Sequence, residues 1–140
     1  MAFWLSHHHE DELNRTFLIA GARVCARCVA TYPTLVAVIA LQFQLRAPLG
    51  WRHDEVAGVA LLLPALVDWA WGRFRPRGGT NAIRVATGIF LGIALGRSLY
   101  IHLQKPLPTV LVLQLALSVL VALPVLLWTY GRKNTDIDRS

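Results

Sequence analysis

Four long apolar stretches, separated by short polar segments, limit what this chain can fold into. They cover about residues 25–45, 55–72, 82–100 and 109–130. A helix needs ~20 apolar residues to cross the hydrocarbon core of a bilayer. Within lipid a helix satisfies all of its own backbone hydrogen bonds, whereas irregular backbone does not. The sequence therefore predicts an all-α membrane protein, a bundle of four transmembrane helices in a single domain, 1–140.

The composition agrees with a membrane environment. Only 16% of the residues are charged, whereas a soluble domain has about 25%. The formal net charge of +6 would suggest nucleic acid in a soluble protein. Here the arginines flank the apolar stretches, and no aromatic interleaving or base-reading motif accompanies them. We therefore expect a lipid bilayer as the partner, with no nucleic acid, and the plasma membrane as the location. A homo-oligomer or a larger membrane complex stays open.

Arginine and lysine indicate the orientation. An even number of spans places both termini on one side. Ten basic residues share that side: Arg15, Arg23, Arg27, Arg73, Arg75, Arg77, Arg84, Arg132, Lys133 and Arg139. Four lie opposite: Arg46, Arg52, Arg97 and Lys105. Since cytoplasmic loops carry the excess of basic residues, we expect both termini in the cytoplasm (N-in/C-in).

The first 24 residues form the short N-terminal cytoplasmic segment, and residues 131–140 form a polar tail. Apolar residues in the first segment are loosely spaced as in a short surface helix: Leu13, Phe17, Leu18 and Val24. The sequence therefore predicts a short helix along the membrane surface before the first span, with a frayed tail over residues 1–12 as the alternative.

The third span has two features that predict helix packing. Gly88, Gly92 and Gly96 recur every four residues, so they lie on one helix face. Small residues at this spacing allow a second helix to approach closely, and we expect that helix to be the first or second span. Asn81 stands at the start of the third span, where asparagine is a favoured N-cap.

Cys25 and Cys28 are the most chemically distinctive residues. They occupy positions i and i+3 at the entry of the first span, so both sulfur atoms can face the same side. Arg23 and Arg27 favour the thiolate form. Three interpretations are open: half of a metal site, a redox-active dithiol, or two small apolar residues at a helix end.

Candidates for the other metal ligands are the histidines upstream, His8 and His9, and the acid of the second span, Asp68. Tetrahedral cysteine and histidine ligation suits zinc best, and thiolates also hold Cu(I). A carboxylate within a span is costly unless it is paired. We expect Asp68 to pair with Arg84, which lies at a similar depth. Arg15, Asn81 and Arg84 should then form a polar cluster near the cysteines.

A combination of short motifs resembles the DUF2085 family of small predicted membrane proteins. The first motif is Arg15-Thr16-Phe17, followed by Gly21, Cys25-Ala26-Arg27-Cys28 and Tyr32. The second is Pro64 with Asp68, and the third is Asn81-Ala82-Ile83-Arg84-Val85-Ala86-Thr87-Gly88. Together they cover about residues 7–96. The resemblance implies an integral membrane protein whose polar motifs gather at one end, and it implies no activity.

The chain departs from the family pattern at two places. The family has Cys-His upstream of the arginine, where this chain has His8-His9, and Ala30 replaces a glycine. A histidine would then replace a cysteine ligand, or the site is degraded. Three functions follow from these residues. The first is a cytoplasmic-side Cys/His metal site, the second a membrane thiol oxidoreductase using the CxxC pair and a quinone, and the third an accessory subunit of a membrane complex.

Overall fold

Four helices and one β-hairpin make up the computed structural model, which describes residues 15–137 except 20 and 76–78. The helices are α1 (Ala26–Gln44), α2 (Asp54–Phe74), α3 (Asn81–Gln104) and α4 (Thr109–Ile137). Each contains a segment that is long and apolar enough to cross a membrane. The predicted fold class, an all-α bundle of four membrane-spanning helices, is therefore confirmed.

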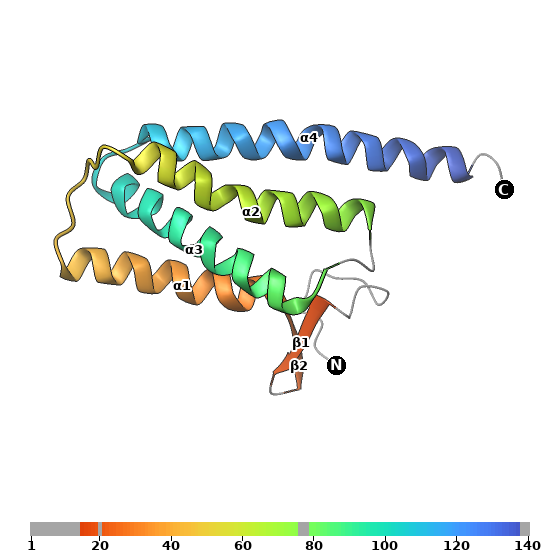
Figure 1. The fold of residues 1–140 in the computed structure, drawn as a ribbon, viewed down its shortest axis with the longest axis horizontal. Coiled ribbons are helices and arrows are strands. Elements are labelled where there is room, and N and C mark those ends of the chain that lie inside the picture. The colour runs from red at the N-terminus through yellow and green to blue at the C-terminus, as the bar shows by residue number, and fades with distance from the viewer. Residues whose placement is uncertain (1–14, 20, 76–78, 138–140) are drawn as a thin grey trace.

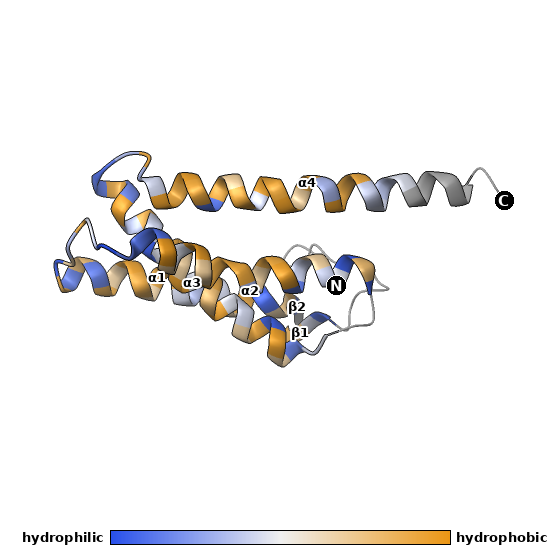
Figure 2. Cartoon of the chain, turned by 45° about the horizontal axis from the view of Figure 1, so that its top comes forward, coloured by the Kyte–Doolittle hydropathy of each residue, from blue (hydrophilic) through white to orange (hydrophobic). Residues whose placement is uncertain are grey.

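Successive helices run antiparallel to one another, so the polar segments gather at the two ends of the bundle (Figure 1). The hairpin, the turn before α3 and the end of α4 lie at one end, which we call the hairpin end. The turns between α1 and α2 and between α3 and α4 lie at the opposite end. Figure 2 shows apolar residues along the length of the helices and hydrophilic residues concentrated at these ends. This distribution matches a bilayer that surrounds the middle of the bundle.

The segment before α1 is a hairpin, so the predicted surface helix is wrong there. Strand β1 (Thr16–Ile19) pairs antiparallel with β2 (Ala22–Cys25). Gly21 lies in the two-residue connection with φ of +79°, a conformation that glycine adopts at little cost and that tight hairpins require. Leu13, a further member of the predicted helix, lies outside the described residues.

Helix α3 is the centre of the bundle, and its glycines lie directly against α1. A methyl group added at Gly88 would stand 2.7 Å from the carbonyl oxygen of Arg27, and one at Gly92 would stand 2.7 Å from that of Thr31. At Gly96 it would meet Val38 at 2.9 Å. Only a residue without Cβ allows the two backbones to lie so close. Helices α2 and α4 pack on the other sides of this pair.

The N-cap of α3 is Thr80, not Asn81 as the sequence suggested. The Thr80 hydroxyl accepts a hydrogen bond from the backbone N–H of Ile83 at 3.3 Å. Asn81 is the first helical residue, and its side chain accepts a hydrogen bond from Arg84 instead. Both residue types cap helices well, so composition alone does not choose between two neighbouring candidates.

Candidate functional site

The two cysteines lie at the junction of the hairpin and the first helix. Cys25 ends β2 and is only 5% exposed, and Cys28 lies in the first turn of α1 and is half-buried. Both are free thiols, and their side chains are close enough to interact. The change from extended to helical backbone at Cys25 therefore brings the two sulfur atoms together at one point.

The hairpin is fastened to the end of α2. A terminal nitrogen of Arg15 donates a hydrogen bond of 2.9 Å to the backbone carbonyl of Gly72. Arg23 on β2 donates to the hydroxyl of Thr16 on β1 at 3.5 Å. Thr16, the first residue of β1, is the register partner of Cys25. The chain therefore enters the hairpin beside this buried cysteine.

Asp68 of α2 is contacted by side chains of two neighbouring helices. Its Oδ2 atom forms an ion pair with Arg27 of α1 and accepts a hydrogen bond of 3.5 Å from Thr87 of α3. The expected partner, Arg84, is also near enough to interact electrostatically with Asp68. Asp68 therefore links α1, α2 and α3, whereas the sequence suggested a link between α2 and α3 alone.

Arg84 is the centre of the charges at this end. It is 6% exposed, donates to the side chain of Asn81 at 3.2 Å, and interacts electrostatically with four groups. Those groups are Arg15, Asp68, Arg27 and Cys25. We call these five residues the hairpin cluster. It contains Arg15 and Arg84 of the polar cluster predicted from the sequence, and Asn81, the third residue of that prediction, accepts the hydrogen bond from Arg84.

The structure leaves the predicted metal ligands divided. Cys25 and Cys28 are together, whereas Asp68 is occupied by Arg27 and Thr87. His8 and His9 lie outside the described residues. Within the part of the chain that the structure describes, no three side chains of histidine, cysteine, aspartate or glutamate come together as a metal site. A complete site would need a ligand from elsewhere.

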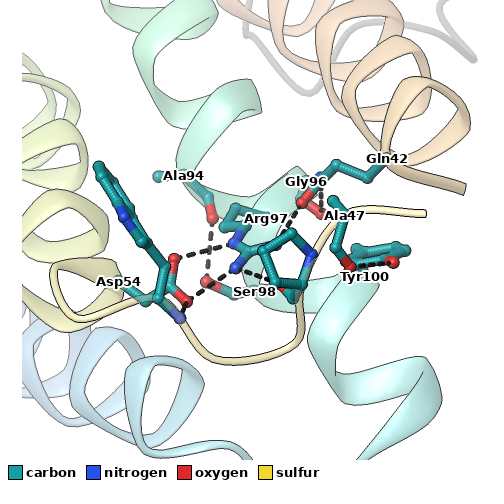
Figure 3. Close-up of polar contacts among 10 residues, drawn as sticks. Gln42, Ala47, Asp54, Ala94, Gly96, Arg97, Ser98 and Tyr100 are labelled. Carbon is teal, nitrogen blue, oxygen red and sulfur yellow. Dashed lines mark hydrogen bonds and ion pairs between the residues drawn. The ribbon is translucent and has the colours of Figure 1, made fainter. Parts of the chain in front are cut away.

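A second polar cluster, at the opposite end, was not expected from the sequence. Arg97 of α3 donates two hydrogen bonds of 2.8 Å to the carboxylate of Asp54 at the start of α2 (Figure 3). It also donates to Gln42 of α1 at 2.9 Å and to the carbonyl of Pro48 at 2.8 Å. In this Arg97 cluster most N–H donors of one guanidinium are engaged in hydrogen bonds, and these bonds connect α1, α2 and α3. The pattern is structural, because the guanidinium has little left to offer a ligand.

Comparison with known proteins agrees with this architecture. A family model described as "Predicted membrane protein (DUF2085)" matches residues 8–97. The chain belongs to the DUF2085 family. The match covers the hairpin, α1, α2 and most of α3, so both polar clusters of this DUF2085 protein lie within the shared region. No curated protein and no solved structure matched the chain significantly. Membership establishes an integral membrane protein and assigns no reaction.

Proposed function

We propose that this membrane protein binds a thiophilic metal ion through Cys25 and Cys28, with zinc as the first candidate and Cu(I) as the second. The observation that carries the proposal is the position of the two free thiols, at the end of β2 and in the first turn of α1, close enough to interact with each other. Two sulfur atoms that already meet need little rearrangement to hold one tetrahedral ion. Binding would displace the thiol protons, since the thiolate is the ligand.

The remaining ligands would come from His8 and His9. Thr16 pairs with Cys25 in the hairpin register, so the chain enters the hairpin beside the buried thiol. The seven residue-to-residue steps from His9 to Thr16 can span ~23 Å when extended, which is enough to reach the sulfur atoms. Asp68 is left out of the proposed ligand set, because Arg27 and Thr87 already engage its Oδ2 atom.

Metal analysis of the full-length protein tests the proposal. We expect one zinc ion per chain after purification without chelators, and its loss in Cys25→Ser and Cys28→Ser. The double variant H8A/H9A should bind more weakly. His53→Ala is the matched control, since His53 is exposed at the opposite end. A wild-type protein that contains no metal, and that takes up Co(II) without a thiolate charge-transfer band, contradicts the proposal.

The same thiol contact supports a second candidate, thiol oxidation. Formation of a Cys25–Cys28 disulfide releases two protons and two electrons, and a membrane quinone would accept both. Maleimide labelling separates the two functions. Labelling that rises with a chelator supports metal binding, whereas labelling that requires a reductant supports the oxidoreductase. Other membrane proteins that copurify equally well with both serine variants would point to an accessory subunit.

A further inference from the structure

The tip of the β-hairpin exposes apolar side chains. Leu18 is 70% exposed and Ile19 is 47% exposed, and both belong to strand β1. Successive side chains of a strand point to opposite faces, so these two leave the hairpin on opposite sides. Both faces of the tip therefore present an apolar side chain that the described part of the chain leaves largely uncovered.

The two faces of the hairpin differ away from the tip. Phe17 and Val24 are register partners, and strand alternation places them on the same face as Ile19. On the other face Leu18 lies opposite Arg23. An arginine can rest its apolar stem on such neighbours and keep its charged end in water. A surface with one apolar face and one arginine beside a leucine suits the boundary between water and lipid.

The base of the hairpin is fixed at the level where α2 ends. Cys25 directly precedes the first residue of α1, so β2 joins a membrane-spanning helix without a linker. At the start of β1, Arg15 donates its 2.9 Å hydrogen bond to the carbonyl of Gly72, in the last turn of α2. Trp69 and Trp71 lie close by in the same helix, and tryptophan is typical of the membrane interface. The hairpin therefore begins at the depth of that interface.

The hairpin extends along the membrane surface and not away from it. In Figure 1 its strands lie across the direction of the helices and reach no further out than the end of α2. Figure 2 likewise places both strands within the length of α2. A four-residue strand is ~13 Å long, so strands aligned with the helices would carry the tip away from the bilayer. The crosswise direction keeps the tip at the level where the spans end.

The lipid-facing surface of α1 leads up to the hairpin. Tyr32 and Val36 of this helix are exposed, as expected for a span that lipid surrounds. Because the hairpin continues from the end of this helix, the same lipid can cover both faces of its tip. A protein that docked on one face would leave the apolar side chain of the other face in water.

We propose that the hairpin is an anchor that lies in the interfacial layer of the bilayer, with Leu18 and Ile19 inserted among the lipid chains next to the headgroups. Removal of apolar surface from water drives the insertion. Such an anchor holds β2, and with it Cys25, at the membrane surface. The inference requires no bound metal and goes beyond the proposed function.

Photo-crosslinking in the host-cell membrane tests what covers the tip. The photoreactive residue p-benzoylphenylalanine replaces Leu18 or Ile19 in the full-length protein, and mass spectrometry identifies the product of irradiation. We expect lipid adducts at both positions, in a yield comparable to that at Val36, an exposed position within α1. The control is Arg52, which is exposed in the turn between α1 and α2. It should give a yield several-fold lower.

Three results overturn the proposal. A main crosslink from either position to residues 1–14 would show that the chain's own N-terminal segment covers the tip. A main crosslink to another protein would make the tip a protein-docking surface. Failure of either position to form a lipid adduct, while Val36 still forms one, would show that lipid does not surround the tip.

A second measurement uses the unsubstituted protein and serves where the substituted hairpin does not fold. The methyl groups of isoleucine are labelled for NMR in nanodiscs, and Ile19→Val assigns the signal of Ile19. A nitroxide carried on lipid near the headgroup should broaden this signal more than a water-soluble gadolinium chelate does. Ile89, which is exposed within α3, should be protected from the chelate. Stronger broadening of Ile19 by the chelate than by the lipid nitroxide would place the tip in water.

Discussion

At the scale of single residues, the depth of Asp68 was easier to predict than the full set of its partners. Helical rise gives the level of Asp68 and Arg84 in the bilayer, but it does not say which neighbouring helix supplies the nearest cation. The ion pair of Asp68 is with Arg27, which stands in α1 beside the glycines of α3. Likewise, hydropathy does not predict the ion pair between Arg97 and Asp54, because it forms only through the packing of α2 against α3.

Removal of Arg97 should destabilise the protein strongly. In Arg97→Ala the carboxylate of Asp54, which is only 8% exposed, loses both of the hydrogen bonds that it accepts from the guanidinium. We expect the free energy of unfolding to fall by about 3 kcal/mol, as for other buried ion pairs that lose one partner. Steric-trap or denaturant unfolding in detergent measures it. Arg52→Ala, which removes an exposed arginine, should stay within about 0.5 kcal/mol of wild type. Equal values for both variants would show that the Arg97 cluster contributes no stability.

Arg27 and Asp68 should be energetically coupled. Either single change, Arg27→Gln or Asp68→Asn, leaves a partly buried charge without its partner. The double variant removes both charges. We therefore expect a double-mutant cycle to give a coupling energy of about 1–3 kcal/mol in unfolding. The cycle that combines Asp68→Asn with Arg52→Gln, at the opposite end, should be additive. Additivity in both cycles would mean that the ion pair is not stabilising.

At the scale of elements, the helices were easier to predict than the hairpin. Each helix is a long apolar run, and a run of that length has one solution in lipid. The strands have four residues each, which is too short for a clear alternation of apolar and polar side chains. The available signals were the β-branched Thr16 and Ile19 and the following Gly21. Such residues favour strands and tight turns.

Substitution of a central glycine should separate α1 from α3. In Gly92→Ala the new methyl group would stand 2.7 Å from the carbonyl oxygen of Thr31 and 2.8 Å from Cβ of Thr34. Backbone atoms cannot move aside as the end of a flexible side chain can. We therefore expect the free energy of unfolding to fall by about 1–3 kcal/mol. Gly131→Ala is the control, since nothing lies within 4 Å of its new methyl group. A neutral Gly92→Ala would contradict the close approach.

At the scale of the whole molecule, the architecture follows from the sequence but the orientation does not follow from the structure. The bundle has two polar ends. From the charge count we expect the hairpin end to face the cytoplasm. The candidate site is intermediate: the sequence suggested that the cysteines, Asp68 and Arg84 lie at one end, whereas the ion pair of Asp68 with Arg27 required the packed structure.

Reporter fusions test the orientation. A fluorescent protein joined to either terminus should fold and emit in the cytoplasm, and alkaline phosphatase at the same positions should be inactive. Fusions after Arg52, in the turn between α1 and α2, should give the reverse pattern. Active phosphatase at both termini would place the hairpin end outside and would expose the cysteines to an oxidising compartment.

The pairing of α1 with α3 also has a consequence for biosynthesis. Synthesis proceeds from the N-terminus, so α1 is complete before α2 exists, and its closest neighbour follows only after α2 and the next turn. During this interval α1 presents to lipid the face that the glycines of α3 later cover. Its mean hydropathy of 1.4 is about half the 2.7 of α4, so lipid favours its insertion less strongly than that of α4. The order of synthesis thus leaves α1 in the bilayer without the helix against which it packs until α2 and the following turn are complete.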